Sequence, residues 1–360
     1  MNRKRVSLAA AAAGTLAGVT GLAVLAVPAG AGPSPALPSI SADQLVRSVL
    51  EVKSVPAMTG TVTGTNNLGL PSIPGLGKAS ALLANGSTTA RVWADGNGRG
   101  RLSLPDGNSE ETVVYDGKTV WDWESSAKTV KKFTAGTAGQ EREEAVDPAA
   151  TARKLVDLLD KSSVVRVDGT GTVAGRPVYQ LVLTPKPTER TMLREVRVAV
   201  DSETRVPLRL SVTGNGSAQP ALRIGFSNLT VGAQDPALFQ FTPPAGAKVT
   251  TGEQRVPEQD SRAETAPADI EPTVVGNGWD TVFIARLPVG PMTNADPNAG
   301  RSGQDSDALL KQLGKPVSGA WGTGYAISTS VGTALITSDG RVAAGAVPLQ
   351  VLTGALENSR

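Results

Sequence analysis

Residues 196–212 read VRVAVDSETRVPLRLSV, and this stretch decides the fold. Val196, Val198 and Val200 alternate with other residues, and the alternation resumes after a turn at 201–203. A period of two places the apolar side chains on one face of a strand and the remaining ones on the other face. The stretch therefore predicts two antiparallel strands, each with one apolar and one polar face.

The same pattern extends in both directions along the chain. Residues 163–228 hold further alternating segments, and residues 87–133 hold shorter ones separated by Asp-Gly pairs at 95–96, 106–107 and 116–117. An Asp-Gly pair between alternating segments indicates a hairpin, because glycine adopts the positive φ that tight turns need. These segments predict a long antiparallel sheet built largely from hairpins.

Two amphipathic helices are expected to cover part of this sheet. Ser41 and Gln44 form the pattern of a capping box, so one helix should begin there and end before Pro56. Asp147 and Pro148 mark the start of a second helix, whose apolar residues recur at helical spacing. Two helices cannot cover a large curved sheet completely, so part of its apolar face should remain open to a ligand.

The N-terminus has the three parts of a secretory signal. A basic start is followed by an uncharged stretch over residues 6–27 and by small residues up to Ala31. We predict export, with cleavage after Ala31 and a location in the cell envelope or outside the cell. The alternative is a retained N-terminal anchor, since 22 uncharged residues can span a bilayer. Removal of the three basic residues at 3–5 changes the net charge from +2 to −1, which gives no reason to expect nucleic acid as a partner.

Composition divides the rest of the chain into four parts. Residues 32–40 form a proline-rich spacer, and residues 41–250 hold the helices and the long strands. Residues 251–272 lose periodicity and gain Glu, Gln, Asp and Pro, which is typical of a linker. Residues 273–360 alternate short strand and helix patterns and are expected to form a small α+β C-terminal domain. The predicted fold class is mainly antiparallel β with α.

The chain has 360 residues with no Cys and no His, which excludes disulfides, thiol nucleophiles and imidazole bases. A Ser–Lys dyad at Ser125 and Lys128 would lie on a hairpin tip, where the lysine is not desolvated enough to act as a base. Acidic clusters at 110–111 and 141–144 fit a solvated surface better than paired catalytic carboxylates. We therefore expect no enzymatic activity, no cofactor and no bound metal.

The open part of the apolar face provides the candidate ligand-binding residues. They are large apolar or aromatic side chains on the predicted strands, and the alternative for each is an ordinary place in the core. The candidate lining is Trp93, Leu102, Leu104, Tyr115, Trp121, Trp123, Leu181, Leu210, Ile224 and Phe226.

The loop at 68–76 adds three further candidates, Leu70, Ile73 and Leu76. It combines apolar residues with glycine and proline, so it reads as neither helix nor strand. Such a loop suits a lid or a lipid-surface contact. The alternative is a plug that tucks into the half-open sheet.

Several segments resemble known families. The order of a helix, hairpins, the segment YDGKTVW at 115–121, a helix and long strands resembles the lipoprotein-carrier (LolA-type) superfamily. The segments TVAGRPVYQLVLTPK at 172–186 and VRVAVDSETRVPLR at 196–209 resemble the MucB/RseB type of sigma-factor regulator. The segment LFQFTPP at 238–244 fits both groups, and the resemblance covers about residues 41–250.

The C-terminal part resembles the second domain of the MucB/RseB type through WDTVFI at 279–284 and GAVP at 345–348. The chain departs from that family at 187–193, where PTERTML replaces an Arg- and Tyr-rich stretch. This departure puts a regulatory contact of the family in doubt.

The resemblance implies an incomplete β-barrel that helices close around an apolar cavity. It also implies a protein that is not an enzyme. The first hypothesis is an exported carrier that holds a lipid or a lipoprotein acyl chain in the half-barrel. The second is a regulator that binds the extracytoplasmic part of a membrane anti-sigma factor through residues 273–360. A hydrolase is a third possibility, and it would need a cleft with carboxyl groups of raised pKa.

Overall fold

The structure is a computed structural model that describes residues 34–69, 86–134, 161–252, 273–286 and 313–358. Five predictions lie outside these ranges: the signal at 1–31, the loop residues Leu70, Ile73 and Leu76, the acidic cluster at 141–144, the helix that begins at Asp147, and linker residues 253–272.

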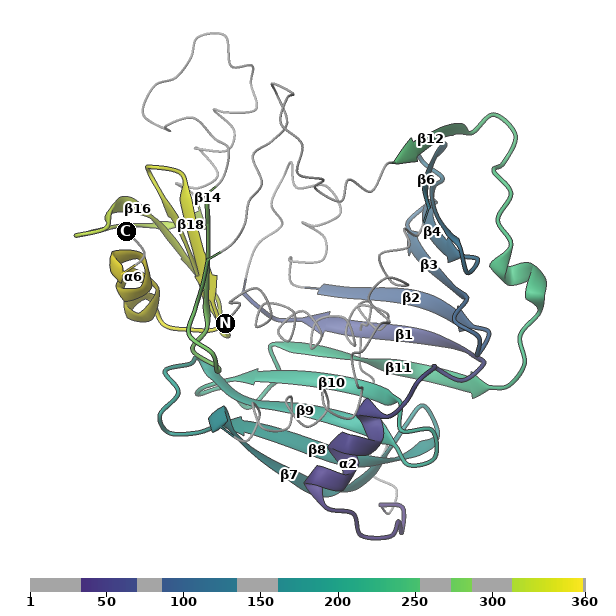
Figure 1. The fold of residues 1–360 in the computed structure, drawn as a ribbon, viewed down its shortest axis with the longest axis horizontal. Helices are drawn as coiled ribbons and strands as arrows, with labels where there is room; N and C mark the ends of the chain where they lie inside the picture. Colours follow the sequence, from purple (N-terminus) through teal and green to yellow (C-terminus); the bar gives the residue numbers. More distant parts are fainter. Residues whose placement is uncertain (1–33, 70–85, 135–160, 253–272, 287–312, 359–360) are drawn as a thin grey trace, which may run out of the picture.

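One sheet of twelve strands dominates the chain (Figure 1). Every neighbouring pair is antiparallel except β12 and β6, which are parallel. The outermost strands β12 and β7 lie at opposite ends of the sheet order, so the barrel is incomplete, as predicted. In spatial order the strands are β12 (Lys248–Gly252), β6 (Thr129–Thr134), β5 (Thr119–Glu124), β4 (Ser109–Tyr115), β3 (Gly100–Asp106), β2 (Gly86–Ala94), β1 (Met58–Asn66), β11 (Leu222–Val231), β10 (Pro207–Gly214), β9 (Leu193–Asp201), β8 (Arg176–Pro185) and β7 (Ser163–Val173).

The expected hairpin turns are present between the short strands. Asp116 accepts hydrogen bonds at Oδ1 from the backbone N–H groups of Lys118 and Thr119, at 2.9 and 2.8 Å. Gly117 follows Asp116 with φ +100°, a conformation that favours glycine. The local sequence therefore decides where β4 ends and β5 begins.

Helix α2 (Ala42–Leu50) covers one face of the sheet over β7–β9 (Figure 1). Its capping box forms as predicted, because Ser41 Oγ accepts from the Gln44 N–H and Gln44 Oε1 accepts from the Ser41 N–H, both at 3.2 Å. Leu45 and Val46 pack against Tyr179, Leu181 and Val200. The sheet face on the α2 side is called the inner face below, and the opposite face is called the outer face.

The sheet bends around α2, so that β3–β6 rise at one end of a floor formed by β7–β11 (Figure 1). Strand β1 lies before this bend and carries Gly60 and Gly64 at inner positions. A Cβ atom on Gly60 would lie 2.8 Å from the ring of Phe226, so only glycine lets that ring lie across β1. The missing side chain at Gly60 makes room on the inner side for the ring of Phe226, which packs with Met58 and Val62.

A second sheet stands at the other end of the floor, with helix α6 (Leu349–Asn358) packed on one of its faces (Figure 1). Leu335, Ala343, Leu352 and Leu356 are fully buried between this sheet and the helix. In spatial order its strands are β13 (Thr273–Val275), β14 (Val282–Arg286), β18 (Arg341–Gly345), β17 (Thr333–Thr337), β16 (Gly322–Ser328) and β15 (Lys315–Gly319).

Hydrogen bonds join the two sheets. The Met192 N–H donates to the Ala346 carbonyl at 2.8 Å, and the indole N–H of Trp279 donates to Ser163 Oγ at 2.7 Å. The Trp279 N–H also donates to Glu189 Oε2 at 2.7 Å. These bonds anchor the second sheet to the ends of β7 and β9.

Replacement of Leu45 by alanine tests the packing of α2. Leu45 is fully buried, so Leu45→Ala should lower the free energy of unfolding by about 3 kcal/mol. Arg47→Ala on the exposed side of the same helix serves as the control. Urea unfolding of both variants measures the difference, and equal stabilities would contradict the assigned packing.

Candidate binding face

The inner face of the sheet is apolar beyond the area that α2 covers. Directly paired residues of antiparallel strands point to the same face, so the register assigns every position. Val92 pairs with Leu102 and Leu102 with Val113, which gives a continuous apolar row across β2, β3 and β4. The half-buried apolar residues at inner positions of β2–β5, β10 and β11 include Val92, Leu102, Leu104, Val113, Tyr115, Val120, Leu210 and Ile224.

The structure brings seven of the predicted lining residues to this inner face. Of these, Leu181 is buried beneath α2, and Phe226 is buried across β1. The other five are half-buried. The seven residues are Leu102, Leu104, Tyr115, Leu181, Leu210, Ile224 and Phe226.

The three predicted tryptophans lie on the outer face, which corrects their place in the lining. On β4, Val113 pairs with inner-face Leu102, so Val113 is inner and its two neighbours, Thr112 and Val114, are outer. Trp121 pairs with Val114 and Trp123 pairs with Thr112, so both tryptophans are outer as well. Trp93 pairs with Arg101 on the same outer side. Alternation within one strand shows which residues share a face, but only the pairing register shows which face that is.

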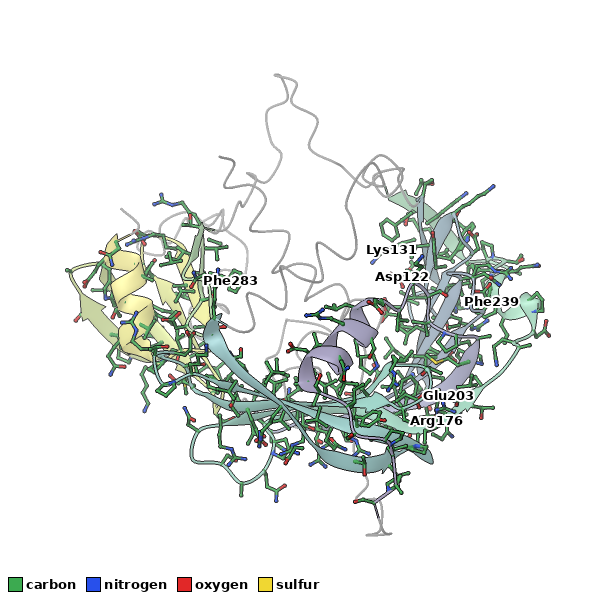
Figure 2. All side chains as sticks on the ribbon, turned by 60° about the horizontal axis from the view of Figure 1, so that its bottom comes forward. Asp122, Lys131, Arg176, Glu203, Phe239 and Phe283 are labelled. Atoms are coloured by element: carbon green, nitrogen blue, oxygen red, sulfur yellow. The ribbon has the colours of Figure 1, made fainter. Side chains whose placement is uncertain are left out.

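The outer tryptophans have a structural role at one end of the sheet. The chain beyond β11 crosses the outer side of the rising strands, where Phe239 of the short helix η3 (Pro236–Phe239) is fully buried (Figure 2). The ring of Phe241 lies 5.6 Å from that of Trp121. The indole N–H of Trp121 donates to Asp116 Oδ2 at 3.2 Å. In the sequence this segment stands out only by its resemblance at 238–244, because the burial of Phe239 and the ring contact of Phe241 involve strands that are distant along the chain.

Charged residues border the apolar row on the inner face. Asp122 of β5 and Lys131 of β6 are directly paired and lie on the inner side of the rising strands (Figure 2). Glu111 and Glu124 pair at inner positions of β4 and β5. The apolar row is therefore bounded by polar groups toward β6 and by α2 toward β7.

The second sheet has an apolar face of its own, on the side opposite α6. Val274 and Phe283 pair directly and are 40% and 45% exposed. Phe283 lies on the side of the second sheet that faces α2 (Figure 2). Its row continues through Ala344 and Ala334 to Ile327 without a charged residue.

The Ser125–Lys128 segment forms a hairpin turn between β5 and β6. Ser125 Oγ accepts a 2.6 Å hydrogen bond from the Glu110 N–H, and Ser126 Oγ donates to Glu124 at 3.1 Å. Lys128 is exposed and has a φ of +49°. The Lys128 N–H also donates to the Ser125 carbonyl at 3.4 Å, so these contacts serve the turn, and none of them joins a serine hydroxyl to the lysine ammonium group.

The described ranges contain no group of three or more His, Cys, Asp or Glu side chains placed to hold a metal ion. Within the same ranges, no helix has the length and hydropathy needed to cross a bilayer.

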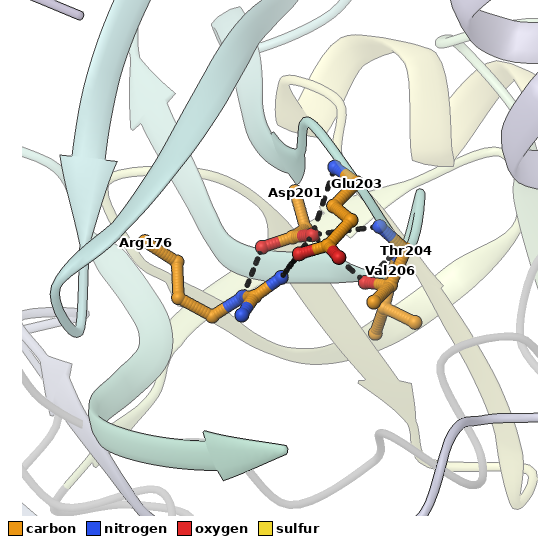
Figure 3. A network of polar contacts seen from close by, with 5 residues as sticks. All are labelled: Arg176, Asp201, Glu203, Thr204 and Val206. Atoms are coloured by element: carbon orange, nitrogen blue, oxygen red, sulfur yellow. Dashed lines mark hydrogen bonds and ion pairs between the residues drawn. The ribbon is translucent and has the colours of Figure 1, made fainter. Parts of the chain in front are cut away.

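Asp201, at the end of β9, is the centre of a network of hydrogen bonds with Arg176, Glu203 and Thr204, which is called the clamp below (Figure 3). Fully buried Asp201 accepts two hydrogen bonds from Arg176, at 2.5 and 2.9 Å. The same carboxylate accepts from the backbone N–H groups of Glu203 and Thr204, at 3.0 and 2.7 Å. Arg176 also donates to Glu203 at 2.9 Å. The clamp ties the β9–β10 turn to the start of β8.

Burial alone would raise the pKa of Asp201, but the hydrogen bonds from Arg176, Thr204 and Glu203 outweigh it and hold the pKa below its usual range. The hydrogen bond with Asp201 raises the pKa of Arg176 above its already high ordinary value. Both groups are therefore charged at neutral pH, so the clamp is a structural ion pair and has no proton to exchange there.

No family model matches the sequence, and no curated protein matches it either. Solved structures that are similar in fold include MucB in complex with MucA(peri), at 18% identity and a TM-score of 0.46, covering 88% of this chain and 97% of that one. A MucA/MucB complex from Pseudomonas aeruginosa matches at 18% identity and a TM-score of 0.45, covering 88% and 96%. A LolA superfamily protein from Nitrosomonas europaea matches at 11% identity and a TM-score of 0.21, covering 56% and 99%.

These structures come from the two groups that the sequence segments resemble. They are proteins to which this chain is similar, and they assign no ligand, partner or residue role to it.

The clamp predicts a stability change with a defined pH dependence. Asp201→Asn removes one partner of a buried ion pair, so it should lower the free energy of unfolding by about 3 kcal/mol at neutral pH. Because the folded-state pKa of Asp201 is depressed, its contribution is present above the unfolded pKa of about 4 and is lost as the pH falls through the folded value. Urea unfolding from neutral pH into acid should show the two proteins converging, and a constant difference would contradict the assignment.

Proposed function

We propose that this chain is an exported, non-enzymatic binding protein that holds an apolar chain, a lipid or a lipoprotein acyl chain, against the inner face of its open sheet. The single observation that carries the proposal is the half-buried apolar row through Val92, Leu102 and Val113. A soluble sheet normally covers such a face with its own helices. Here α2 packs over β7–β9, and the row lies beyond it.

The distribution of charge between the two faces supports the same function. The inner positions of β10, β11, β1 and β2 hold no charged side chain, whereas the outer positions of the same strands hold arginines. An acyl chain on the inner face would bury apolar surface on both partners, at roughly 25 cal/mol per Å2. The predicted signal at 1–31 would place the protein where lipids and lipoproteins cross the envelope.

Displacement of a fluorescent long-chain fatty acid tests this function. Leu102→Glu puts a carboxylate in the middle of the apolar row and should weaken binding by about tenfold or more, because a charge facing an apolar chain stays unpaired. Thr89→Glu adds the same charge at an exposed outer position of the adjacent strand β2, and it should bind like the wild type. Native mass spectrometry of the protein from its own host should then detect a bound acyl lipid.

Equal binding by Leu102→Glu and wild type would show that the inner face does not hold the ligand. A protein that is isolated without lipid and takes up none when it is added would remove the carrier function altogether.

The second candidate function is that of a regulator that binds the extracytoplasmic part of a membrane anti-sigma factor. A specific observation favours it, namely the exposed apolar pair Val274 and Phe283 on the second sheet. Two large apolar side chains side by side on an exposed sheet face are typical of a protein-binding surface. The row behind them has no charge up to Ile327, so a partner segment would meet an apolar strip.

Crosslinking in intact cells separates the two functions. If a partner segment binds the second sheet, Phe283→Asp should abolish its crosslink while fatty-acid binding persists. Leu102→Glu should give the opposite pattern and provides the matched control. A membrane anti-sigma factor that is crosslinked equally by both variants would contradict docking on this face.

A further inference from the structure

Within the described residues, the outer face of β10, β11, β1, β2 and β3 carries an excess of positive charge. Across β10, β11, β1, β2 and β3 the register places four arginines at outer positions, Arg209, Arg223, Arg91 and Arg101. The only carboxylate in these five strands is Asp106, at an inner position at the end of β3. The remaining outer positions are largely Ser, Thr and Asn, including four threonines on β1.

Arg209 and Arg223 form the centre of this surface. Arg209 pairs directly with Gly225 and Ser211 pairs with Arg223, so the two arginines are diagonal neighbours on one face, about 7–8 Å apart at the backbone. A Cβ atom on Gly225 would lie 2.9 Å from Cβ and Cγ of Arg209, so the arginine stem lies across the glycine. Gly225 thus provides a groove that directs Arg209 toward β1.

Neither arginine of this pair has a hydrogen bond or ion pair within the described part of the chain. The nearest acidic residue across the sheet on one side, Glu195 of β9, already contacts Arg194 and Arg197, at 3.8 and 3.7 Å. On the other side Glu110 of β4 accepts hydrogen bonds from Ser103 and Thr112, and its charge interacts with Arg101 and Arg91. Arg209 and Arg223 are therefore neighbouring half-buried cations, and the described part of the chain gives neither of them an ion pair.

Burial and then the charge of Arg223 lower the pKa of Arg209 from its ordinary value. The group nevertheless remains protonated, because arginine does not lose its proton in proteins. The fold therefore maintains a repulsive pair of charges, which is a cost unless an anion relieves it.

The geometry indicates the kind of anion. Guanidinium forks match the oxygens of phosphate in a bidentate way, and the neighbouring hydroxyls of Ser211, Thr63 and Thr65 add neutral donors. Arg91 of β2 lies three strands from Arg209 of β10, about 14 Å away across the sheet. Arg101 lies one strand further along, on β3, where it pairs with Trp93 of β2. One small ion cannot reach both pairs of arginines, whereas a chain of phosphates can.

The shape of this face favours a flexible chain over a membrane. The sheet bends between its floor and its rising strands, and the outer face lies on the convex side of that bend (Figure 2). A flat bilayer can touch only one part of a convex surface. The large exposed apolar residues of the described chain also lie elsewhere, at Val164, Val231, Val249, Val274 and Phe283.

We propose that the outer face of β10, β11, β1, β2 and β3 binds a linear phosphate-bearing polymer, with Arg209 and Arg223 as its central contacts. This site is independent of the inner face, which lies on the other side of the same strands. The protein would thereby be held on an anionic envelope polymer while its inner face remains available.

Binding of linear inorganic polyphosphate to the full chain tests this site. The double variant Arg209→Gln/Arg223→Gln should bind about a hundredfold more weakly, since two charge-assisted contacts are lost. Arg47→Gln/Lys53→Gln removes the same charge from exposed positions in and after α2, and it should change affinity by no more than about threefold. Thermal unfolding should show no loss of stability in the double variant, because the substitutions relieve a repulsive pair.

Four outcomes would overturn the proposal. The first is equal weakening in the two double variants, which would indicate general charge attraction. The second is the absence of polyphosphate binding. The third is competition by inorganic phosphate at the same phosphate concentration, which would indicate a site for a single ion. The fourth is binding to vesicles of phosphatidylglycerol and phosphatidylcholine in preference to polyphosphate, which would assign the face to a membrane.

Discussion

The structure depends on the alternation of side chains across one continuous antiparallel sheet. Because each strand is paired in register with the next, the assignment of one residue to a face assigns its neighbours across the sheet. Leu102 is inner because Val92 is inner, and Arg101 is outer for the same reason. A single sheet thus carries an apolar row on one side and, over β10, β11, β1, β2 and β3, a cationic surface rich in hydroxyl groups on the other. A shift of one residue in any hairpin would exchange them.

The bend of the sheet converts these two faces into two different environments. Strand β1 keeps glycine at inner positions, and the ring of Phe226 fills the space above Gly60. The inner face becomes concave and receives α2, while the outer face becomes convex (Figure 2). A concave apolar face suits an acyl chain, and a convex charged face suits a flexible polyanion. The same curvature therefore supports both proposals.

Separate contacts hold the ends of the strands and the second sheet in place. At one end the Arg176–Asp201 clamp holds the β9–β10 turn, and at the other end Trp279 and Met192 anchor the second sheet. The rising strands are held by the segment that follows β11, in which Phe239 is buried against their outer side. These contacts fix strand ends and the second sheet, and none of them involves the apolar row of the inner face.

The sequence by itself determined the local elements of this protein. The capping box at Ser41 defines the start of α2, and Asp-Gly pairs define the hairpin turns, because both signals act within a few residues. Alternation also identified the strands and showed that Leu102 and Leu104 share one face. Only the tertiary structure decided that Trp121 and Trp123 are outer, since the relation between neighbouring strands depends on their register. Only the tertiary structure brought Arg209 beside Arg223 across Gly225, because the hairpin pattern does not state the register in which two neighbouring strands pair.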